Sequence, residues 1–363
     1  MNKQSKIYVA GHMGLVGSAI WKNLKSKGYT QLIGKSRKEL DLMNPIAVER
    51  FFNEEKPEYV FLAAAKVGGI VANNKYRGQF LFENLMIQNN IIHQAYLNGV
   101  KKLLFLGSTC IYPREAPQPM PEDCLLTSPL EYTNEPYAIA KIAGIKMCES
   151  YNIQYGTNFL SVMPTNLYGP NDNFDLENSH VLPALIRKIH LGKCLEDKNW
   201  NAIRKDLNER PIGETDGNST AKEIRDKLSQ FGISFQSENQ ETTIEIWGSG
   251  KPMREFLWSE DMADACVFVM ENVSFNDLTT QSVKNEIRNT HINIGTGKEI
   301  SIKDLAELIK QKVGFKGQFI FNTTKPDGTM KKLTNPQKIH ALGWHHSIEI
   351  DEGIDRMYNW YCR

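Results

Sequence analysis

Short apolar runs alternate with longer amphipathic stretches over the first 170 residues of the chain. The apolar runs are bounded by glycine or polar residues, as buried strands often are, and the stretches between them carry apolar residues at helical spacing. This alternation predicts an α/β fold with a doubly wound parallel sheet. We expect strands at residues 7–10, 31–34, 59–65, 102–107 and 158–163, with helices at 18–27, 45–55 and 80–98.

Beyond residue 170 the rhythm changes. Residues 193–243 are polar apart from one amphipathic segment at 221–231, and we interpret them as an insertion that forms a small helical lid. Later stretches predict helices at 178–190, 259–271 and 301–312, the last with Ser301 as N-cap, and a strand at 291–295. We therefore expect one domain at 1–167, to which segments near 245–265 and 288–297 could return, and a smaller α/β domain at 168–363.

Composition narrows the class of protein. The chain has 363 residues, a net charge of +1 and 41% hydrophobic residues, which fits a globular protein with an ample core. It has no strongly basic stripe and no apolar run near the roughly 18 residues of a membrane helix, so we expect no nucleic-acid or membrane partner. The first residues lack the apolar core of a signal peptide, and the six cysteines are scattered. We expect a cytoplasmic protein without a metal site.

A glycine turn directly follows the first predicted strand. Gly11, Gly14 and Gly17 are spaced Gly-x-x-Gly-x-x-Gly, with Leu15 and Val16 in between, and a helix follows. Glycines at such a turn let backbone N–H groups approach a pyrophosphate and let the helix pack close to the sheet. The helix N-terminus then faces the anion. The pattern predicts a dinucleotide site.

The end of the second predicted strand favours one form of the dinucleotide. An acidic residue there would bind a free ribose 2′-hydroxyl, but the chain has Lys35-Ser36-Arg37, whose cations suit a 2′-phosphate. NADPH is therefore favoured over NADH. Asp41 and Leu42 are candidates to flank the adenine ring. The third strand ends in small residues that would let the cofactor lie close, namely Ala63, Ala64 and Ala65.

A third pattern concerns proton transfer. A Pro-rich loop leads into a predicted helix that carries Tyr137 and Lys141, which share a helix face because they lie four residues apart. An ammonium beside a phenol favours phenolate and lowers a pKa that starts at about 10. Ser108 follows the strand at 102–107 and could hold a substrate oxygen by a hydrogen bond. Together these residues predict proton transfer to or from a substrate oxygen.

Several longer motifs occur from end to end, apart from the insertion. They are Ala10-Gly11-His12-x-Gly14-x-Val16-Gly17-Ser18, Gly107-Ser108-x-Cys110-Ile111-Tyr112-Pro113, Tyr137-x-x-x-Lys141, Pro164-Thr165-Asn166-Leu167-Tyr168-Gly169-Pro170, Ser179-His180-Val181, Trp247-Gly248-Ser249-Gly250-x-Pro252-Met253-Arg254-Glu255-Phe256 and Lys325-Pro326-Asp327-Gly328. With these motifs the chain resembles the GDP-L-fucose synthase family of the extended short-chain dehydrogenases/reductases.

The resemblance implies a bifunctional enzyme that uses NADPH. Its activities would be 3,5-epimerase and 4-reductase, its substrate a GDP-4-keto-6-deoxy sugar, and its domains a Rossmann domain and a smaller nucleotide-sugar domain. It also implies a homodimer formed through a bundle of two helices from each subunit.

The resemblance further assigns roles to individual residues. Cys110 would be the base and His180 the acid that move protons at C3 and C5, while Ser108, Tyr137 and Lys141 would stabilise the enolate oxygen and assist hydride transfer. A thiol and an imidazole suit proton exchange near neutral pH. Beyond the residues above, the cofactor set includes Tyr137, Lys141, Pro164, Asn166, Leu167 and His180, and the substrate set is Ser108, Thr109, Cys110, Asn166, Lys188, Trp247, Arg254 and Lys325.

Departures from the family pattern leave alternatives open. Met13 stands where the family often has Arg, Thr109 where it has Ser, and Lys188 where it has Arg. The substrate could therefore be a GDP-4-keto-6-deoxy-heptose, a polysaccharide precursor, rather than a hexose. Epimerisation could occur at C3 alone or C5 alone, or the chain could be a C4-reductase that does not epimerise. A non-catalytic dinucleotide sensor of the same fold is a further alternative.

Overall fold

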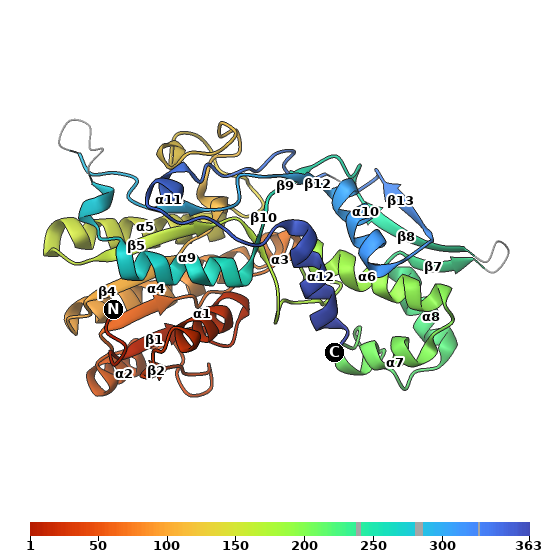
Figure 1. Ribbon diagram of the computed structural model, residues 1–363, viewed down its shortest axis with the longest axis horizontal. Helices are drawn as coiled ribbons and strands as arrows, with labels where there is room; N and C mark the ends of the chain where they lie inside the picture. Colours follow the sequence, from red (N-terminus) through yellow and green to blue (C-terminus); the bar gives the residue numbers. More distant parts are fainter. Residues whose placement is uncertain (237–240, 280–285, 326) are drawn as a thin grey trace. The chain divides into compact units, whose positions relative to one another are not determined.

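The computed structural model describes residues 1–236, 241–279, 286–325 and 327–363, and the chain divides into two compact units (Figure 1). Unit 1 comprises residues 1–171, 255–298 and 333–350, and unit 2 comprises 172–254, 299–332 and 351–363. Residues 237–240 of the expected insertion and Pro326 of the last motif lie outside the described residues.

Unit 1 contains a six-stranded parallel sheet, which confirms the predicted fold class. β1 is the first strand of the chain. β2 lies on one side of it, and β3 and the later strands lie on the other side. This reversal places a switch point between β1 and β3, where ligands of open α/β sheets bind. In spatial order the strands are β2 (Leu32–Ile33), β1 (Ile7–Ala10), β3 (Tyr59–Leu62), β4 (Lys102–Leu106), β5 (Phe159–Pro164) and β11 (Ile292–Ile294).

Helices cover both faces of this sheet, as Figure 1 shows. Side chains alternate along each strand, so Ile7 and Val9 join one apolar core while Tyr8 and Ala10 join the other. The first core is closed by α1 (Leu15–Ser26) and α9 (Ser259–Asn272), and the second by α2 (Pro45–Glu55), α4 (Arg77–Leu97) and α5 (Glu135–Tyr155).

Shorter elements complete unit 1. They are α3 (Ile70–Lys75), the 3-10 turns η1 (Thr109–Ile111), η2 (Glu122–Cys124) and η3 (Asn276–Leu278), the parallel pair β6 (Asn166–Tyr168) and β10 (Phe256–Trp258), and α11 (Gln337–Ala341). The sequence did not predict the helix α3, which follows Gly69.

Unit 2 is built on a small mixed sheet in which β8 lies between β13 and β7. The strands are β13 (Gln318–Asn322), β8 (Glu241–Trp247) and β7 (Ile233–Gln236), with a separate antiparallel pair, β9 (Met253–Arg254) and β12 (Ile300–Ser301). The helices are α6 (Val181–Glu196), α7 (Trp200–Glu209), α8 (Ala221–Gln230), α10 (Ile302–Val313) and α12 (Ile350–Tyr361). Ser301 caps α10 as predicted, since its Oγ accepts the Asp304 N–H at 3.0 Å.

The segment interpreted as a lid is part of the body of unit 2. Its strand β7 pairs antiparallel with β8, and its helices α7 and α8 share an apolar core with α6. Ile203, Leu207, Ile224 and Leu228 are fully buried in that core. The expectation of a separate helical lid was therefore wrong, because the apolar faces of these helices are needed to close unit 2.

Two global features of the described residues bear on function. No described helix is long and apolar enough to cross a membrane, and no described group of three or more His, Cys, Asp or Glu side chains could hold a metal ion. None of the six cysteines, all of which are described, forms a disulfide.

A buried ion pair joins three helices of unit 2. The Arg187 guanidinium in α6 is fully buried, and its Nε and Nη2 donate to Asp206 Oδ2 in α7 at 3.0 and 2.9 Å. Arg187 Nη1 also donates to the Phe174 carbonyl at 3.1 Å, and Tyr361 of α12 donates its hydroxyl proton to Asp206 Oδ1. Both charges are thus compensated inside the core.

We predict that Arg187→Met destabilises the protein by about 3–5 kcal/mol, because the buried Asp206 carboxylate then keeps only its longer ionic contact, with Arg210 at 3.5 Å. The matched control is Lys193→Met in the same helix, where a partly exposed pair with Asp197 is lost. That change should cost no more than about 1 kcal/mol. Urea unfolding measures both, and equal losses in the two variants would contradict this account of α6.

Candidate active site

The glycine turn after β1 is tightly packed. Gly11 has a φ of +83°, and its carbonyl accepts the Gly14 N–H at 3.0 Å. A Cβ on Gly17 would lie 2.0 Å from the Gly11 oxygen, and one on Gly11 would lie 2.9 Å from the Ala64 backbone. Only glycine therefore allows α1 to pack this close to β1 and to the end of β3. The first N–H groups of α1, including those of Leu15 and Val16, have no intrahelical partner and fit a pyrophosphate.

Further predicted cofactor residues lie along the carboxyl edge of the same sheet. The residues directly after β3 stay next to the end of β1, since the Ala63 N–H donates to the Ala10 carbonyl at 3.0 Å. Asn166 is held by its side chain, whose Nδ2 donates to the Glu255 carbonyl at 2.8 Å. The residues brought to this edge, or to the loop after β2, are Ala63, Ala64, Ala65, Pro164, Asn166, Leu167, Asp41 and Leu42.

The basic residues after β2 have local partners. Lys35 forms an ion pair with Glu55 at 3.5 Å. The Ser36 N–H and Oγ both donate to the Glu39 carboxylate, at 2.7 and 2.6 Å, and these bonds hold the Glu39 pKa below its ordinary value. Arg37 is exposed beside them. A 2′-phosphate would therefore compete with the carboxylates of Glu55 and Glu39 for Lys35 and Ser36. The sequence pattern did not reveal this competition.

Lys141 joins α5 to the end of β4. The residue is 3% exposed, and its ammonium donates to the Leu106 carbonyl at 2.8 Å and lies 4.7 Å from the centre of the Phe105 ring. The same Nζ lies 5.7 Å from the centre of the Tyr137 ring, one helical turn earlier. Burial lowers the pKa of Lys141 to about 8, against the opposing influence of Cys110. Phenol and ammonium thus lie close together at the strand end.

The expectation that the pKa of Tyr137 lies below its ordinary value was wrong. Burial raises the pKa of Tyr137 well above its ordinary value, and Cys110 raises it further. Desolvation disfavours the charged forms of both residues, and here it outweighs the attraction between phenolate and ammonium. Tyr137 is therefore a protonated phenol at neutral pH, able to donate its proton to a substrate oxygen.

The turn after β4 brings Ser108 and Cys110 to the same place. Ser108 is the N-cap of η1, where its Oγ accepts the Cys110 N–H at 3.4 Å. Thr109 and Cys110 are 5% and 7% exposed. Cys110 influences the pKa of both Tyr137 and Lys141, so the thiol lies near both groups. These residues come together in unit 1, as the sequence predicted for Ser108, Tyr137 and Lys141 and the resemblance implied for Cys110.

The other predicted residues belong to unit 2, and three of them gather around β8. Trp247 at the end of β8 is 60% exposed, and Lys325 Nζ lies 5.3 Å from the centre of its ring. Lys188 of α6 donates to the carbonyl of Glu245 in β8 at 3.3 Å. Burial lowers the pKa of Lys188 to about 8, with Glu245 opposing the shift. The exposed Trp247 ring beside the Lys325 amine suits a nucleotide base, and the Lys188 amine at the same strand suits a phosphate.

Arg254 and His180 lie elsewhere in unit 2. Arg254 Nη1 donates to the Thr329 and Met253 carbonyls at 2.6 and 2.7 Å, and burial lowers its pKa. His180 occupies the N-cap position of α6 without a side-chain cap bond. Burial lowers the pKa of its imidazole, although the residue as a whole remains exposed.

Two residues of the quoted motifs have contacts that the sequence did not suggest. Glu255 is fully buried, and its carboxylate accepts the Thr334 N–H and Oγ at 2.9 and 2.7 Å and the Gly297 N–H at 2.8 Å. Asp327 accepts the Ser249 N–H and Oγ at 2.8 and 2.7 Å, which fixes the turn after Trp247. Membership of a motif was the only sequence signal for either residue.

A parallel dinucleotide-binding sheet with a serine, a tyrosine and a lysine at its carboxyl edge defines a nicotinamide-dependent oxidoreductase of the short-chain type. The chain belongs to the NAD dependent epimerase/dehydratase family, whose model matches residues 7–210 and 208–295. Within it the chain groups with GDP-L-fucose synthases, which confirms the resemblance. It is 48% identical to GDP-L-fucose synthase 1 of Arabidopsis thaliana over 362 residues, which covers 100% of this chain and 94% of that one.

Two solved structures are similar along their whole length. A GDP-6-OMe-4-keto-L-xylo-heptose reductase from C. jejuni has a TM-score of 0.91 and 48% identity, covering 99% of this chain and 98% of that chain. The GDP-mannoheptose C4 reductase MlghC from Campylobacter jejuni, with NADP bound, has a TM-score of 0.86 and 48% identity, covering 99% of each chain. The chain is thus an enzyme with epimerase and reductase chemistry that uses a nicotinamide cofactor, and the sensor alternative is set aside.

The packing of the turn predicts different effects for two of its glycines. Gly17→Ala should lower the free energy of unfolding by about 1–3 kcal/mol, because the new methyl group overlaps the Gly11 carbonyl. A methyl group on Gly14 would meet only the Gly11 oxygen, at 3.5 Å, so Gly14→Ala should change stability by no more than about 0.5 kcal/mol.

Gly14→Ala should instead weaken binding of the nicotinamide cofactor, because the methyl group would stand where a phosphate approaches the backbone. Urea unfolding and cofactor fluorescence titration separate the two effects. Unchanged stability of Gly17→Ala, or unchanged binding by Gly14→Ala, would contradict this description of the turn.

Proposed function

We propose that the enzyme converts a GDP-4-keto-6-deoxy-hexose by epimerisation at C3 and C5 followed by NADPH-dependent reduction at C4. The observation that carries this proposal is the grouping of Cys110, Tyr137 and Lys141 around the end of β4, in a chain similar over its full length to a GDP-L-fucose synthase. One group of residues can then serve both proton exchange and reduction.

Epimerisation needs a base and an acid on opposite faces of the sugar ring. The C4 carbonyl acidifies the hydrogens at C3 and C5, so removal of either proton gives an enolate whose oxygen must be stabilised. In the proposal, at each of the two carbons in turn, Cys110 removes the proton and His180 delivers a proton to the opposite face. The Tyr137 phenol and the Ser108 hydroxyl donate hydrogen bonds to the enolate oxygen.

Reduction uses the same donors on the same oxygen. The bound nicotinamide supplies a hydride to C4 of the sugar. Tyr137, whose phenol is protonated before the step, gives its proton to the oxygen on C4 as the hydride arrives. Ser108 keeps that oxygen in place, and the Lys141 ammonium beside the phenol stabilises the phenolate that remains.

Two features support NADPH as the reductant. Cationic Lys35 and exposed Arg37 follow β2, where the adenosine ribose of a dinucleotide is read. The similar MlghC structure contains NADP. Met13 and the Glu39 carboxylate oppose a strong preference, so we expect NADPH to be favoured while NADH remains usable.

The GDP part of the substrate fits unit 2. Trp247 would stack on the guanine base, with Lys325 beside it, and Arg254 and Lys188 would bind the diphosphate. Thr109 would line the sugar site together with Asn166, because both lie at the carboxyl edge of the sheet in unit 1.

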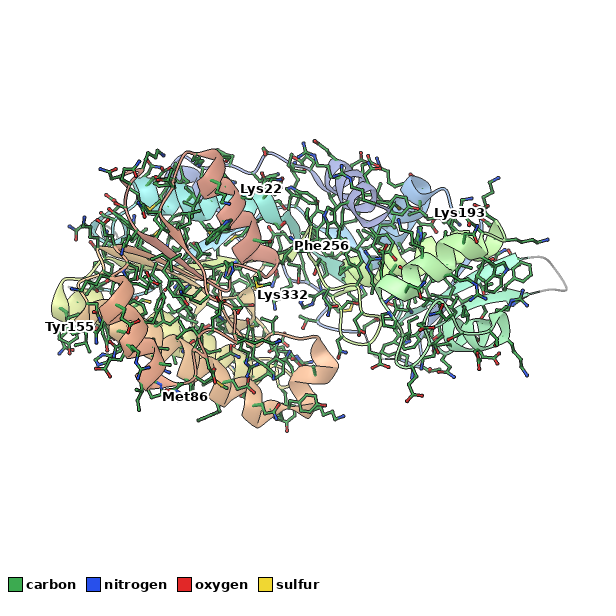
Figure 2. All side chains as sticks on the ribbon, turned by 90° about the horizontal axis from the view of Figure 1, so that it is seen from below. Lys22, Met86, Tyr155, Lys193, Phe256 and Lys332 are labelled. Carbon is green, nitrogen blue, oxygen red and sulfur yellow. The ribbon has the colours of Figure 1, made fainter. Side chains whose placement is uncertain are left out.

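A homodimer formed through α4 and α5 is also proposed. The two helices pack together, and each leaves large apolar side chains exposed. Figure 2 labels Met86 on α4 and Tyr155 at the end of α5. A second copy could cover Phe82, Leu97, Ile139, Ile153 and Tyr155, which are 62%, 58%, 45%, 54% and 44% exposed.

The absence of disulfides among the six cysteines fits a reducing compartment such as the cytoplasm.

A second candidate is reduction of a GDP-4-keto-heptose without epimerisation. The observation that favours it is the TM-score of 0.91 with the C. jejuni heptose reductase. A comparison of kcat/KM on GDP-4-keto-6-deoxy-mannose and on the matching heptose distinguishes the two substrates. We expect the hexose to be preferred, and a preference for the heptose would overturn the first assignment.

Two substitutions test the division of roles. Tyr137→Phe should lower the rate of reduction by about a hundredfold or more while NADPH binding persists, because the proton donor is lost. Cys110→Ser should slow exchange of the C3 and C5 hydrogens with D2O more than it slows reduction. Cys124→Ser is the control, since Cys124 donates to the Pro121 carbonyl at 3.0 Å and a serine hydroxyl can do the same. Unaltered isotope exchange in Cys110→Ser would rule out the thiol as the base.

A further inference from the structure

Tyr112, directly after η1, is tied to the last strand of the sheet. It is 3% exposed, and its hydroxyl donates to Asn293 Oδ1 in β11 at 2.5 Å. The same oxygen lies 3.2 Å from Nε2 of His291, immediately before β11. Because Tyr112 gives its proton to Asn293, Nε2 of His291 must carry the hydrogen of the second bond. The side chain of His291 is fully buried and burial lowers its pKa well below the ordinary value, so the ring is neutral.

The partners of Tyr112 are themselves fixed. The Asn293 N–H donates to the Glu122 carboxylate at 2.9 Å, and Asn293 Nδ2 donates to the Met120 carbonyl at 3.0 Å. Lys338 donates to the His291 carbonyl at 2.9 Å and faces Glu122 at 4.0 Å. Tyr112 therefore binds to a rigid buried network and not to a flexible surface.

The turn that carries Cys110 thus has two anchors. At its start, the Gly107 N–H donates to the Val162 carbonyl in β5 at 2.8 Å, which holds Ser108 at the end of β4. At its end, the ring of Tyr112 is held at β11. Between them the backbone bonds of η1 are long, at 3.3 Å for Ile111 N–H to Ser108 O and 3.4 Å for Tyr112 N–H to Thr109 O. Because these internal bonds are weak, the two anchors determine the position of Cys110.

We propose that Tyr112 is a positioning residue that fixes the Cys110 thiol for proton transfer at the sugar ring. The inference rests on the proposed function, since it assumes that Cys110 is the base. Loss of the Tyr112 hydroxyl leaves the side chains of Asn293 and His291 without this partner and releases the end of the turn. Ser108 keeps its own anchor, and Tyr137 and Lys141 are held by α5. Proton exchange is therefore more sensitive to Tyr112 than hydride transfer is.

The test compares Tyr112→Phe with Tyr29→Phe. Tyr29 is 2% exposed and donates its hydroxyl proton to Glu271, so this control loses a partly buried tyrosine hydrogen bond outside the turn. Deuterium incorporation at C3 and C5 of GDP-4-keto-6-deoxy-mannose should fall about tenfold to a hundredfold in Tyr112→Phe relative to Tyr29→Phe. The oxidation of GDP-L-fucose by NADP+, which needs no proton removal at C3 or C5, should fall by less than about threefold.

A second measurement does not depend on activity. Backbone hydrogen exchange of residues 108–112, followed by mass spectrometry, should be faster in Tyr112→Phe than in wild type and unchanged in Tyr29→Phe. Equal effects of the two substitutions on both readouts would overturn the inference. If wild type incorporates no deuterium at C3 or C5, the proposed function fails instead, and backbone exchange then decides whether Tyr112 anchors the turn.

Discussion

The hydrogen bond from the buried Lys141 ammonium to the Leu106 carbonyl is the interaction on which the proposed active site depends. A charge without water costs free energy unless it is bonded, so this bond strongly favours one position of α5 beside β4. Tyr137 precedes Lys141 by one helical turn, and Ser108 and Cys110 follow β4 directly. One contact therefore brings proton donor, hydrogen-bond donor and thiol to the same strand end.

The same burial determines the charges of the site. Because the folded-state pKa of Lys141, about 8, is below its ordinary value of 10.5, its protonation opposes folding. This penalty is complete below pH about 8 and disappears as the pH rises towards 10.5, where the unfolded lysine also loses its proton. Burial also keeps Tyr137 protonated. Burial of Lys141 thus costs some stability at neutral pH, and the site then holds a protonated phenol beside a cation.

Much of this arrangement could be predicted because it depends on local pattern. The glycine turn, the parallel strands and the shared helix face of Tyr137 and Lys141 follow from spacing alone, and so does the Ser301 cap. Properties that depend on distant residues could not be predicted. The pKa of Tyr137 depends on burial that no local pattern reports, and the partners of Lys35 and Ser36, Glu55 and Glu39, are defined only by the folded loop. The segment at 193–243 was misread because its polar composition hid the apolar faces of α7 and α8.

In the proposed reaction, one group of residues at the end of β4 supports both proton exchange and reduction. Incubation of the wild-type enzyme with GDP-4-keto-6-deoxy-mannose in D2O, first without and then with NADPH and followed by NMR, tests this shared role. We expect deuterium at C3 and C5 before NADPH is added and GDP-L-fucose afterwards. Reduction without deuterium at either carbon would disprove the shared role, because Cys110 and His180 would then take no part in the reaction.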